Sequence, residues 1–299
     1  MLTHLLLLSK DPKHKVKKKV EEDKQGVSSV FMEDFYSAAL KRYIKVEVIL
    51  PPWYKETPNH SFPLLLMNDG QSLKQIKVKE ALTDLYLSNS IPPIIVVGIH
   101  AKNRLNEYGV AGHPDYKNRG DKASNYSRFV INELLPLIRK NFRVHAEQEG
   151  NVFAGFSLGG LSAFDIVWNY PQVFRKAGVF SGSFWWRSKD YKDGYEDNTD
   201  RILHKLIRTT DSKSNQQFWF QTGTEDELSD RNNSGIIDSI HDTMDVISEL
   251  ELLGFENGKD IEYVEVAGGK HNEETWAQVF PDFLKWAFGI SKYNTNSDQ

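Results

Sequence analysis

The chain has 299 residues, enough for one large α/β domain of about 250 residues with tails at both ends. Hydrophobic residues make up 39% of it and charged residues 26%, a balance that predicts a folded chain and excludes a wholly disordered one. The 37 basic and 41 acidic residues leave a net charge of -4, which disfavours general nucleic-acid binding, and the lack of cysteine excludes disulfides, thiolate metal sites and a cysteine nucleophile.

The two ends are set apart from the fold by their polarity. Residues 1–28 contain the lysine-rich run Lys10 to Lys19, and we expect a flexible basic arm there. The apolar run Leu5 to Leu8 is too short for a signal peptide and its positive charges follow it, so we expect no export signal and a cytoplasmic location. No apolar stretch reaches the roughly 18–20 residues that span a bilayer, so no membrane partner is expected. Residues 291–299 are predicted to be a frayed tail, which leaves residues 29–290 as a single domain.

Between these ends, apolar runs of strand length alternate with segments of helical period. This alternation predicts an α/β fold with a mainly parallel central sheet and helices on both faces. Several runs are continuous stretches of β-branched or aromatic residues, as expected for strands that are buried on both faces. The predicted strands are Ile44–Leu50, Pro63–Met67, Ile94–Ile99, Asn151–Ala154, Ala177–Phe180, Phe218–Gln221 and Ile261–Val266.

Two apolar stripes predict helices between the strands. The first comprises Ile131, Leu134, Leu135, Ile138 and Phe142. The second comprises Ile236, Ile240, Met244, Ile247 and Leu250. Pro136 predicts a kink in the first helix, and Gly254 is placed to form a left-handed cap of the second. The polar segment Lys189 to Asp200 is interpreted as a long surface loop or lid and not as a linker between domains.

The segment Gly155-Phe156-Ser157-Leu158-Gly159 contains the pattern G-x-S-x-G, which a chain of this length shows by chance on the order of 0.1 times. Its context strengthens it, because a predicted strand precedes Ser157 and a helical stretch, Leu158 to Trp168, follows it. This is the setting of a nucleophile elbow, with Ser157 as nucleophile and the Leu158 N–H as an oxyanion donor. The alternative is a tight turn that glycine permits, with an inert serine.

A reactive serine needs a base, and His271 has the best position of the nine histidines. It follows the predicted strand Ile261–Val266 through the glycine-containing segment Ala267 to Lys270, and it precedes a predicted helix, Glu274 to Phe288. It therefore lies at the carboxyl edge of the sheet, where Ser157 also lies. His100, at the end of another strand, is the competing candidate and a candidate pocket residue.

The third member of a triad is a carboxylate that fixes the tautomer of the histidine, in the chain order serine, acid, histidine. The cluster Thr222 to Glu227 lies between Ser157 and His271 at another strand end. We prefer Asp226 as the orienting acid, and Glu225 stays open as the alternative. A solvated turn that caps the next helix is the non-catalytic interpretation.

Several motifs, taken together, resemble the esterase D-like family of the α/β-hydrolase superfamily, over roughly Phe31 to Phe288. They are Asn68-Asp69-Gly70-Gln71-Ser72, Val97-Gly98-Ile99-His100 with Arg104 and Glu107-Tyr108, Gly155 to Gly160, Ser181-Gly182-Ser183-Phe184-Trp185-Trp186, Gly223 to Asp226 and Gly269-Lys270-His271. The double tryptophan is most similar to the ferric enterobactin (siderophore) esterases, and feruloyl esterases belong to the same family.

The resemblance implies that Ser157 is the nucleophile, Asp226 the acid and His271 the base of an ester hydrolase. It also implies a second oxyanion donor in the turn after the strand that ends at Met67, for which we choose the Gln71 N–H. Around the site we expect an aromatic wall suited to an aryl or sugar-like ester, and Arg104 as a ligand for an anionic group. The wall residues are Trp185, Trp186, Tyr108 and His100. Core packing of the tryptophans and an Arg104–Glu107 ion pair are the structural alternatives.

The leading hypothesis is a serine carboxylesterase that acts through an acyl-enzyme on a small-molecule ester, such as a siderophore, feruloyl or acetyl-sugar ester. This chemistry needs no metal and no cofactor. An acyltransferase or thioesterase on the same scaffold, or a non-catalytic binding protein with a hydrolase fold, are the alternatives.

Overall fold

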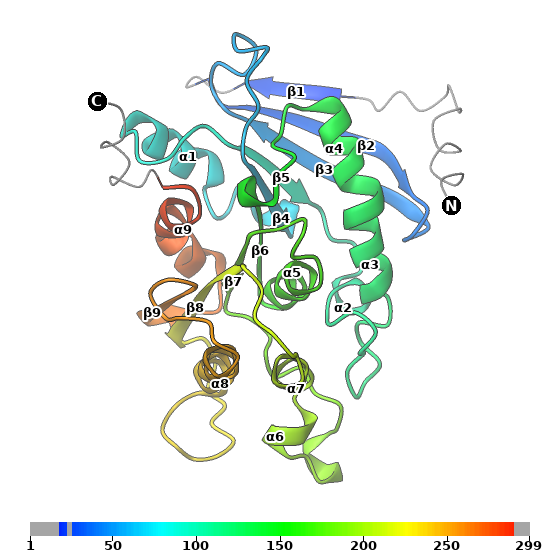
Figure 1. The fold of residues 1–299 in the computed structure, drawn as a ribbon, viewed down its shortest axis with the longest axis vertical. Coiled ribbons are helices and arrows are strands. Elements are labelled where there is room, and N and C mark those ends of the chain that lie inside the picture. Colours follow the sequence, from blue (N-terminus) through cyan, green and yellow to red (C-terminus); the bar gives the residue numbers. More distant parts are fainter. Residues whose placement is uncertain (1–17, 23–25, 290–299) are drawn as a thin grey trace.

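The computed structural model describes residues 18–22 and 26–289, and these fold around one nine-stranded sheet (Figure 1). Its strand order is β1-β2-β3-β5-β4-β6-β7-β8-β9. Strands β1 to β3 and the β3–β5 pair are antiparallel, whereas β4 to β9 pair in parallel, so the predicted mainly parallel sheet is confirmed. The strands are β1 (Lys18–Glu22), β2 (Ser28–Ser37), β3 (Arg42–Leu50), β4 (Leu64–Asn68), β5 (Ile95–Ile99), β6 (Asn151–Phe156), β7 (Lys176–Phe180), β8 (Gln217–Glu225) and β9 (Ile261–Lys270).

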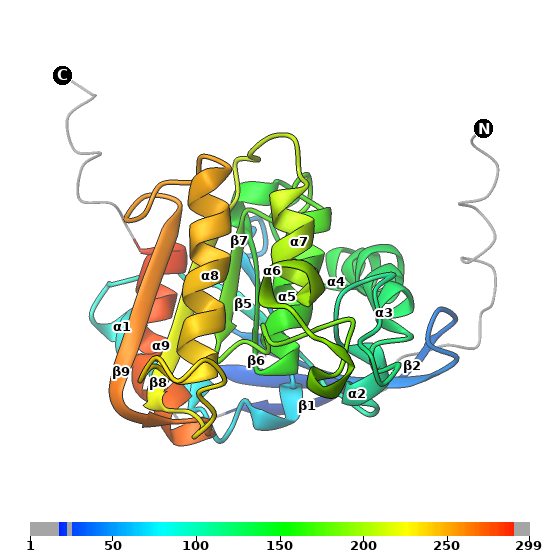
Figure 2. The ribbon, with the colours of Figure 1, turned by 90° about the horizontal axis from the view of Figure 1, so that it is seen from below.

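Helices cover both faces of the sheet, as predicted (Figures 1 and 2). One face packs against α1 (Val78–Leu87) and α9 (Glu273–Phe288). The other face is covered by α3 (Ala123–Phe129), α4 (Leu135–Asn141), α5 (Leu158–Asn169), α7 (Ile202–Arg208) and α8 (Asp238–Leu252). The short helices α2 (Arg104–Glu107) and α6 (Asp197–Asp200) lie in connections. Among the described helices, none has the length and apolar character needed to cross a membrane.

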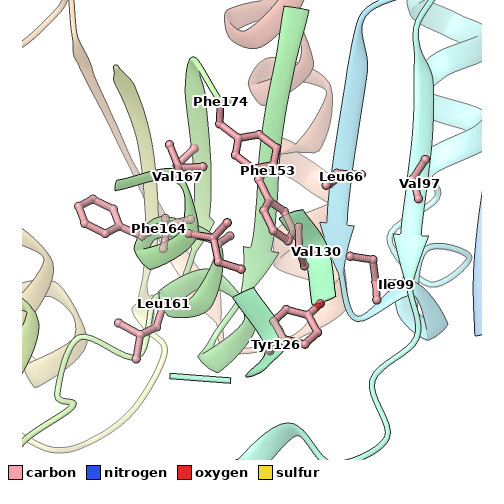
Figure 3. Packing of buried hydrophobic residues seen from close by; sticks show 14 of the residues in the cluster. Leu66, Val97, Ile99, Tyr126, Val130, Phe153, Leu161, Phe164, Val167 and Phe174 are labelled. Atoms are coloured by element: carbon pink, nitrogen blue, oxygen red, sulfur yellow. The ribbon is translucent and has the colours of Figure 1, made fainter. Parts of the chain in front are cut away.

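The central strands are buried on both faces because their side chains are apolar on both sides. Strands β4 and β5 read Leu-Leu-Leu-Met-Asn and Ile-Val-Val-Gly-Ile, and every residue in them is buried. Figure 3 shows the larger core cluster, which contains Leu66 of β4, Phe153 of β6 and Phe164 of α5. Continuous apolar sequence of this kind is what parallel strands between two helical layers require.

Every predicted strand is present, and β8 and β9 extend furthest beyond their predicted ends. The segments Thr222 to Glu225 and Ala267 to Lys270, expected to be loops, continue β8 and β9, and Glu225 pairs with Lys270. Strand β2 was not predicted, because its exposed polar residues interrupt the apolar run.

The N-terminal prediction needs a correction. Part of the expected flexible arm, Lys18–Glu22, forms β1 and pairs with β2, so that Lys18 lies opposite Met32 and Glu22 opposite Ser28. Backbone hydrogen bonds to the edge of β2 fix this charged run, and its composition alone does not reveal them. Strand β2 begins at Ser28, so the boundary expected after residue 28 falls inside a strand. The rest of the expected arm, 1–17 and 23–25, and the expected tail, 291–299, lie outside the described residues.

The predicted helices are present, with two local differences. A π-helical turn, Val130–Leu134, joins α3 to α4 just before Pro136, where a kink was expected. A π-turn shifts the hydrogen-bond ladder and so accommodates the N–H that proline lacks.

In α8 the left-handed cap at Gly254 is confirmed by its φ of 100°. The predicted stripe is only partly buried, because Met244 of α8 is exposed, as is Ile236, which precedes the helix. Asp242 takes a place on the buried face instead, where it pairs with Arg201 and Arg231. The expected loop Lys189 to Asp200 carries a short 3-10 turn and α6.

Candidate active site

Ser157 stands at a sharp turn between β6 and α5, with φ 54° and ψ -124°. This backbone conformation is unfavourable for any residue with a side chain. A Cβ on Gly155 would overlap the carbonyl of Gly159, and a Cβ on Gly159 would lie 2.6 Å from Asp69 Oδ2. The Ser157 N–H donates to Phe180 O at 2.9 Å, which ties the turn to the end of β7. The predicted strand, elbow and helix are therefore present, and the half-buried Ser157 side chain stands at the start of α5.

Asp226 and His271 directly follow two neighbouring strands, β8 and β9. The strand ends approach closely, since a Cβ on Gly223 would lie 2.2 Å from Gly269 O. The Gly268 N–H also donates to Thr224 Oγ1 at 2.7 Å. These contacts bring the two side chains to the same edge of the sheet as the elbow of β6.

Asp226 and His271 each affect the pKa of the other. Burial raises the pKa of Asp226, whereas the Ser181 hydroxyl, the backbone at Gly223 and the charge of His271 lower it. The residue His271 is exposed as a whole, but protein around its ring lowers its pKa below 6.5, while the Asp226 carboxylate raises it. In the described part of the chain, no hydrogen bond joins the His271 ring to Asp226 or to Ser157, and both Asp226 oxygens are buried without a partner of ordinary geometry.

The structure also distinguishes the two candidate acids. The Glu225 side chain is 59% exposed and lies 3.9 Å from Lys270 Nζ, so it faces solvent and not the site. The Asp226 residue is 9% exposed and lies in the electrostatic field of His271. Of the two acids, the structure therefore brings Asp226 to the histidine.

Trp276, in the first turn of α9, connects these parts, and the sequence pattern did not single it out. Its ring stacks on Phe156, the residue before Ser157, with centroids 4.8 Å apart. The His271 ring meets the same indole edge-on at 5.4 Å. The indole N–H donates to Ser181 Oγ at 3.0 Å. Its sequence signal was its place in the predicted helix, five residues after His271.

The two expected oxyanion donors lie at the same edge. Leu158 is the first residue of α5, where N–H groups lack a partner within the helix. Gln71 lies in the turn Gly70–Ser72 after β4, the strand next to β6. Its side chain is held by two hydrogen bonds of 3.0 Å, to Asp69 Oδ1 and from the Ala101 N–H. Within residues 26–289 the Gln71 N–H makes no hydrogen bond, so it stays available to a ligand.

The predicted role of Arg104 is corrected. Its Nε and Nη2 donate to the two carboxylate oxygens of Asp69 at 2.7 and 3.1 Å, and Nη2 also reaches Phe156 O at 3.4 Å. Glu107 pairs with Arg42 and not with Arg104. Asp69 is buried, which raises its pKa, and the Arg104 guanidinium opposes that rise. Arg104 therefore braces the turns that carry Gln71 and Ser157.

Two expected wall residues belong to the core. Trp186 is fully buried, donates its indole N–H to His113 O at 3.0 Å, and fills space that a Cβ on Gly109 or Gly120 would occupy. Tyr108 is also fully buried, and its hydroxyl accepts a hydrogen bond from the Asp69 N–H at 3.1 Å. Neither side chain lines a substrate surface, because packing among distant segments has enclosed both.

The other two wall residues stay partly accessible. Trp185 is half-buried, and the guanidinium of Arg119 lies 4.8 Å from its ring. His100, at the end of β5, is half-buried, and burial followed by the charge of Lys45 lowers its pKa to about 4. In residues 18–22 and 26–289, no group of three or more acidic or histidine side chains is placed to hold a metal ion.

A second serine, which was not assigned a role from the sequence, lies close to the Ser157 hydroxyl. The Ser183 hydroxyl oxygen lies 3.3 Å from Ser157 Oγ. Ser183 belongs to the turn after β7, the neighbour of β6, and it is 3% exposed. Its place at another carboxyl end of the sheet was the signal that could have identified it.

Comparison with known proteins places the chain in a family. A family model described as "Putative esterase" matches residues 37–287. The uncharacterized protein YbbA of Bacillus subtilis is 27% identical over 247 residues, which cover 81% of this chain and 92% of that protein. Esterase Rv1288 of Mycobacterium tuberculosis is 32% identical over 151 residues, 50% of this chain and 31% of the esterase. The chain thus spans about a third of the mycobacterial protein.

Among solved structures, the enterobactin esterase of Shigella flexneri superposes with a TM-score of 0.68 at 19% identity. The match covers 90% of this chain and 60% of that one. At this identity the likeness concerns the fold, which is that of the α/β-hydrolase esterases.

Proposed function

The chain belongs to the Putative esterase family and is a carboxylic ester hydrolase, and we propose that it works as a serine esterase with Ser157, His271 and Asp226 as its triad. The observation that carries the proposal is the left-handed backbone of Ser157 at φ 54°. Such a strained backbone costs free energy and is typical of functional sites, and a strand–serine–helix turn is the setting of a nucleophilic serine.

In the proposed reaction, Ser157 Oγ attacks the ester carbonyl while its proton passes to His271. The carbonyl oxygen becomes an oxyanion between the N–H groups of Leu158 and Gln71. His271 then gives the proton to the departing alcohol, which leaves an acyl group on Ser157. A water molecule activated by His271 releases the acid and restores the serine.

The electrostatic environment supports these roles. A general base must be neutral before the reaction, and the surroundings of His271 lower its pKa and so keep it neutral at pH 7. Once it holds the proton, the imidazolium is stabilised by the buried carboxylate of Asp226. The surroundings of His271 therefore prepare the base, and Asp226 stabilises the product of proton transfer.

The substrate is proposed to be a small-molecule ester with an aryl or sugar-like part. The half-buried ring of Trp185 and the accessible part of His100 are the contacts we propose for it, since Trp186 and Tyr108 are enclosed in the core. The Shigella flexneri structural neighbour is an enterobactin esterase, which makes catecholate lactones the first esters to compare with feruloyl and acetyl-sugar esters.

The test is labelling by a fluorophosphonate probe together with hydrolysis of p-nitrophenyl acetate. We expect labelling of the wild-type protein and loss of both activities in Ser157→Ala, with unchanged circular dichroism. The matched control is Ser127→Ala, a buried serine whose hydroxyl bonds only the Ala123 carbonyl of its own helix. Hydrolysis retained by Ser157→Ala would refute the assignment. A panel of aryl, acetyl-sugar, thio- and catecholate-lactone esters then selects the substrate class.

A further inference from the structure

We propose that Ser183 is a further catalytic residue, whose hydroxyl donates a hydrogen bond to Ser157 Oγ as that oxygen loses its proton. This inference rests on the proposed serine mechanism and adds a residue to it. It is carried by the position of Ser183 next to the reacting oxygen.

The turn after β7 is built to place this hydroxyl. Ser181 has a left-handed backbone with φ 47°, and a Cβ on Gly182 would lie 2.6 Å from Val179 Cγ1. The chain therefore turns tightly against β7 directly after Phe180. The Ser183 N–H donates to Ser157 O at 3.2 Å, and the two hydroxyl oxygens lie 3.3 Å apart. Backbone and side chain of Ser183 thus both contact the nucleophile.

Either hydroxyl could donate across the 3.3 Å between the two oxygens, and the proposal assigns the donor role to Ser183. Ser183 is 3% exposed, and in the described part of the chain its hydroxyl has no side-chain or backbone partner other than Ser157 Oγ. Buried polar groups are nearly always hydrogen-bonded, and in this assignment the Ser183 hydroxyl is satisfied by donating to Ser157 Oγ. Because Ser183 donates, the proton of the half-buried Ser157 hydroxyl stays available to His271.

The chemistry of both half-reactions uses this donor. In acylation the Oγ–H bond of Ser157 breaks, its proton goes to His271, and the bond from Oγ to the carbonyl carbon forms. In deacylation a water molecule gives a proton to His271 and its oxygen bonds to the carbonyl carbon, the Oγ–carbon bond then breaks, and Oγ takes that proton from His271. Negative charge grows on Oγ in each step, and a hydrogen bond to a charged oxygen is shorter and stronger than one to a neutral oxygen. Ser183 keeps its own proton throughout.

The experiment compares Ser183→Ala, Ser183→Thr and the control Ser127→Ala with the wild-type protein. In Ser183→Ala we expect kcat and the fluorophosphonate labelling rate to fall about tenfold to hundredfold, which is the range for a hydrogen bond to a charged group. KM should stay unchanged, because the bond strengthens only in the transition state. Ser183→Thr keeps the hydroxyl and should recover most of the rate. Thermal unfolding of each variant verifies that it is folded.

The outcomes separate this inference from the function on which it rests. If the probe labels the wild-type protein and labels Ser183→Ala at the same or a higher rate, the role of Ser183 is refuted and the serine mechanism is not. A folded Ser183→Thr variant that is as slow as Ser183→Ala also overturns it. A wild-type protein that the probe does not label refutes the proposed function, and this inference fails with it.

Discussion

The substitution Gly223→Ala tests whether the contact between β8 and β9 sets the geometry of the acid and the base. The φ of Gly223 is not left-handed, so its backbone conformation suits alanine. The added Cβ, however, would lie 2.2 Å from Gly269 O and 3.0 Å from Asp226 Oδ1. Since Cβ atoms essentially never lie within 3.0 Å of such an atom, the two strand ends must separate by roughly 0.8 Å or more.

This displacement acts directly on the proposed catalytic pair. Asp226 follows Gly223 by three residues and His271 follows Gly269 by two, so separation of the strands moves the carboxylate away from the imidazole. A shift of about 1 Å in a catalytic group costs on the order of 100-fold in rate. Overpacking of this kind costs about 1–3 kcal/mol of stability. We therefore expect kcat/KM for p-nitrophenyl acetate to fall about 100-fold and the free energy of unfolding in urea to fall by about 1–3 kcal/mol.

The matched control is Gly178→Ala, in the middle of β7. Its Cβ would overlap the ring of Phe283, a side chain of α9 that does not belong to the catalytic turns. This variant should lose stability while each folded molecule keeps its activity. Wild-type activity in Gly223→Ala, or equal inactivation in the control, would show that the strand contact does not position the site.

The pH–rate profile should show kcat/KM maintained at pH 6.5 and falling at lower pH as His271 protonates, because the pKa of His271 is lowered. Asp226→Asn removes the charge that raises the pKa of His271 and should move the midpoint lower. A wild-type midpoint above pH 6.5 would contradict the lowered pKa of His271. Trp186→Phe should lower the free energy of unfolding by about 1–3 kcal/mol through the lost indole hydrogen bond and packing, with KM unchanged; a raised KM would return Trp186 to the substrate site. Burial raises the pKa of Asp165 from 3.8 to about 7, so the native protein holds a proton that the unfolded chain releases. Its free energy of unfolding should therefore fall between pH 4 and 7, and Asp165→Asn should weaken this dependence; equal slopes for the two proteins in urea denaturation would disprove it.

The fold and the turns that carry the proposed catalytic residues were predictable where a physical requirement acts locally. A strand between two helical layers must be apolar along its whole length, which made β4 and β5 recognisable. The elbow needs glycine at positions where a Cβ would meet backbone, as at Gly155. Strands β1 and β2 were not predicted, because antiparallel strands at the edge of a sheet pair mainly through backbone hydrogen bonds and tolerate charged side chains.

Sequence alone thus determined the order of elements and the turns that carry Ser157, Asp226 and His271, because backbone sterics and burial restrict which residues can occupy neighbouring positions. Tertiary structure alone decided which side chains meet across those turns. Asp69 and not Glu107 became the partner of Arg104, and Ser183 came to lie beside Ser157. Such pairings depend on strand order and on packing between distant segments, and no local pattern records either of them.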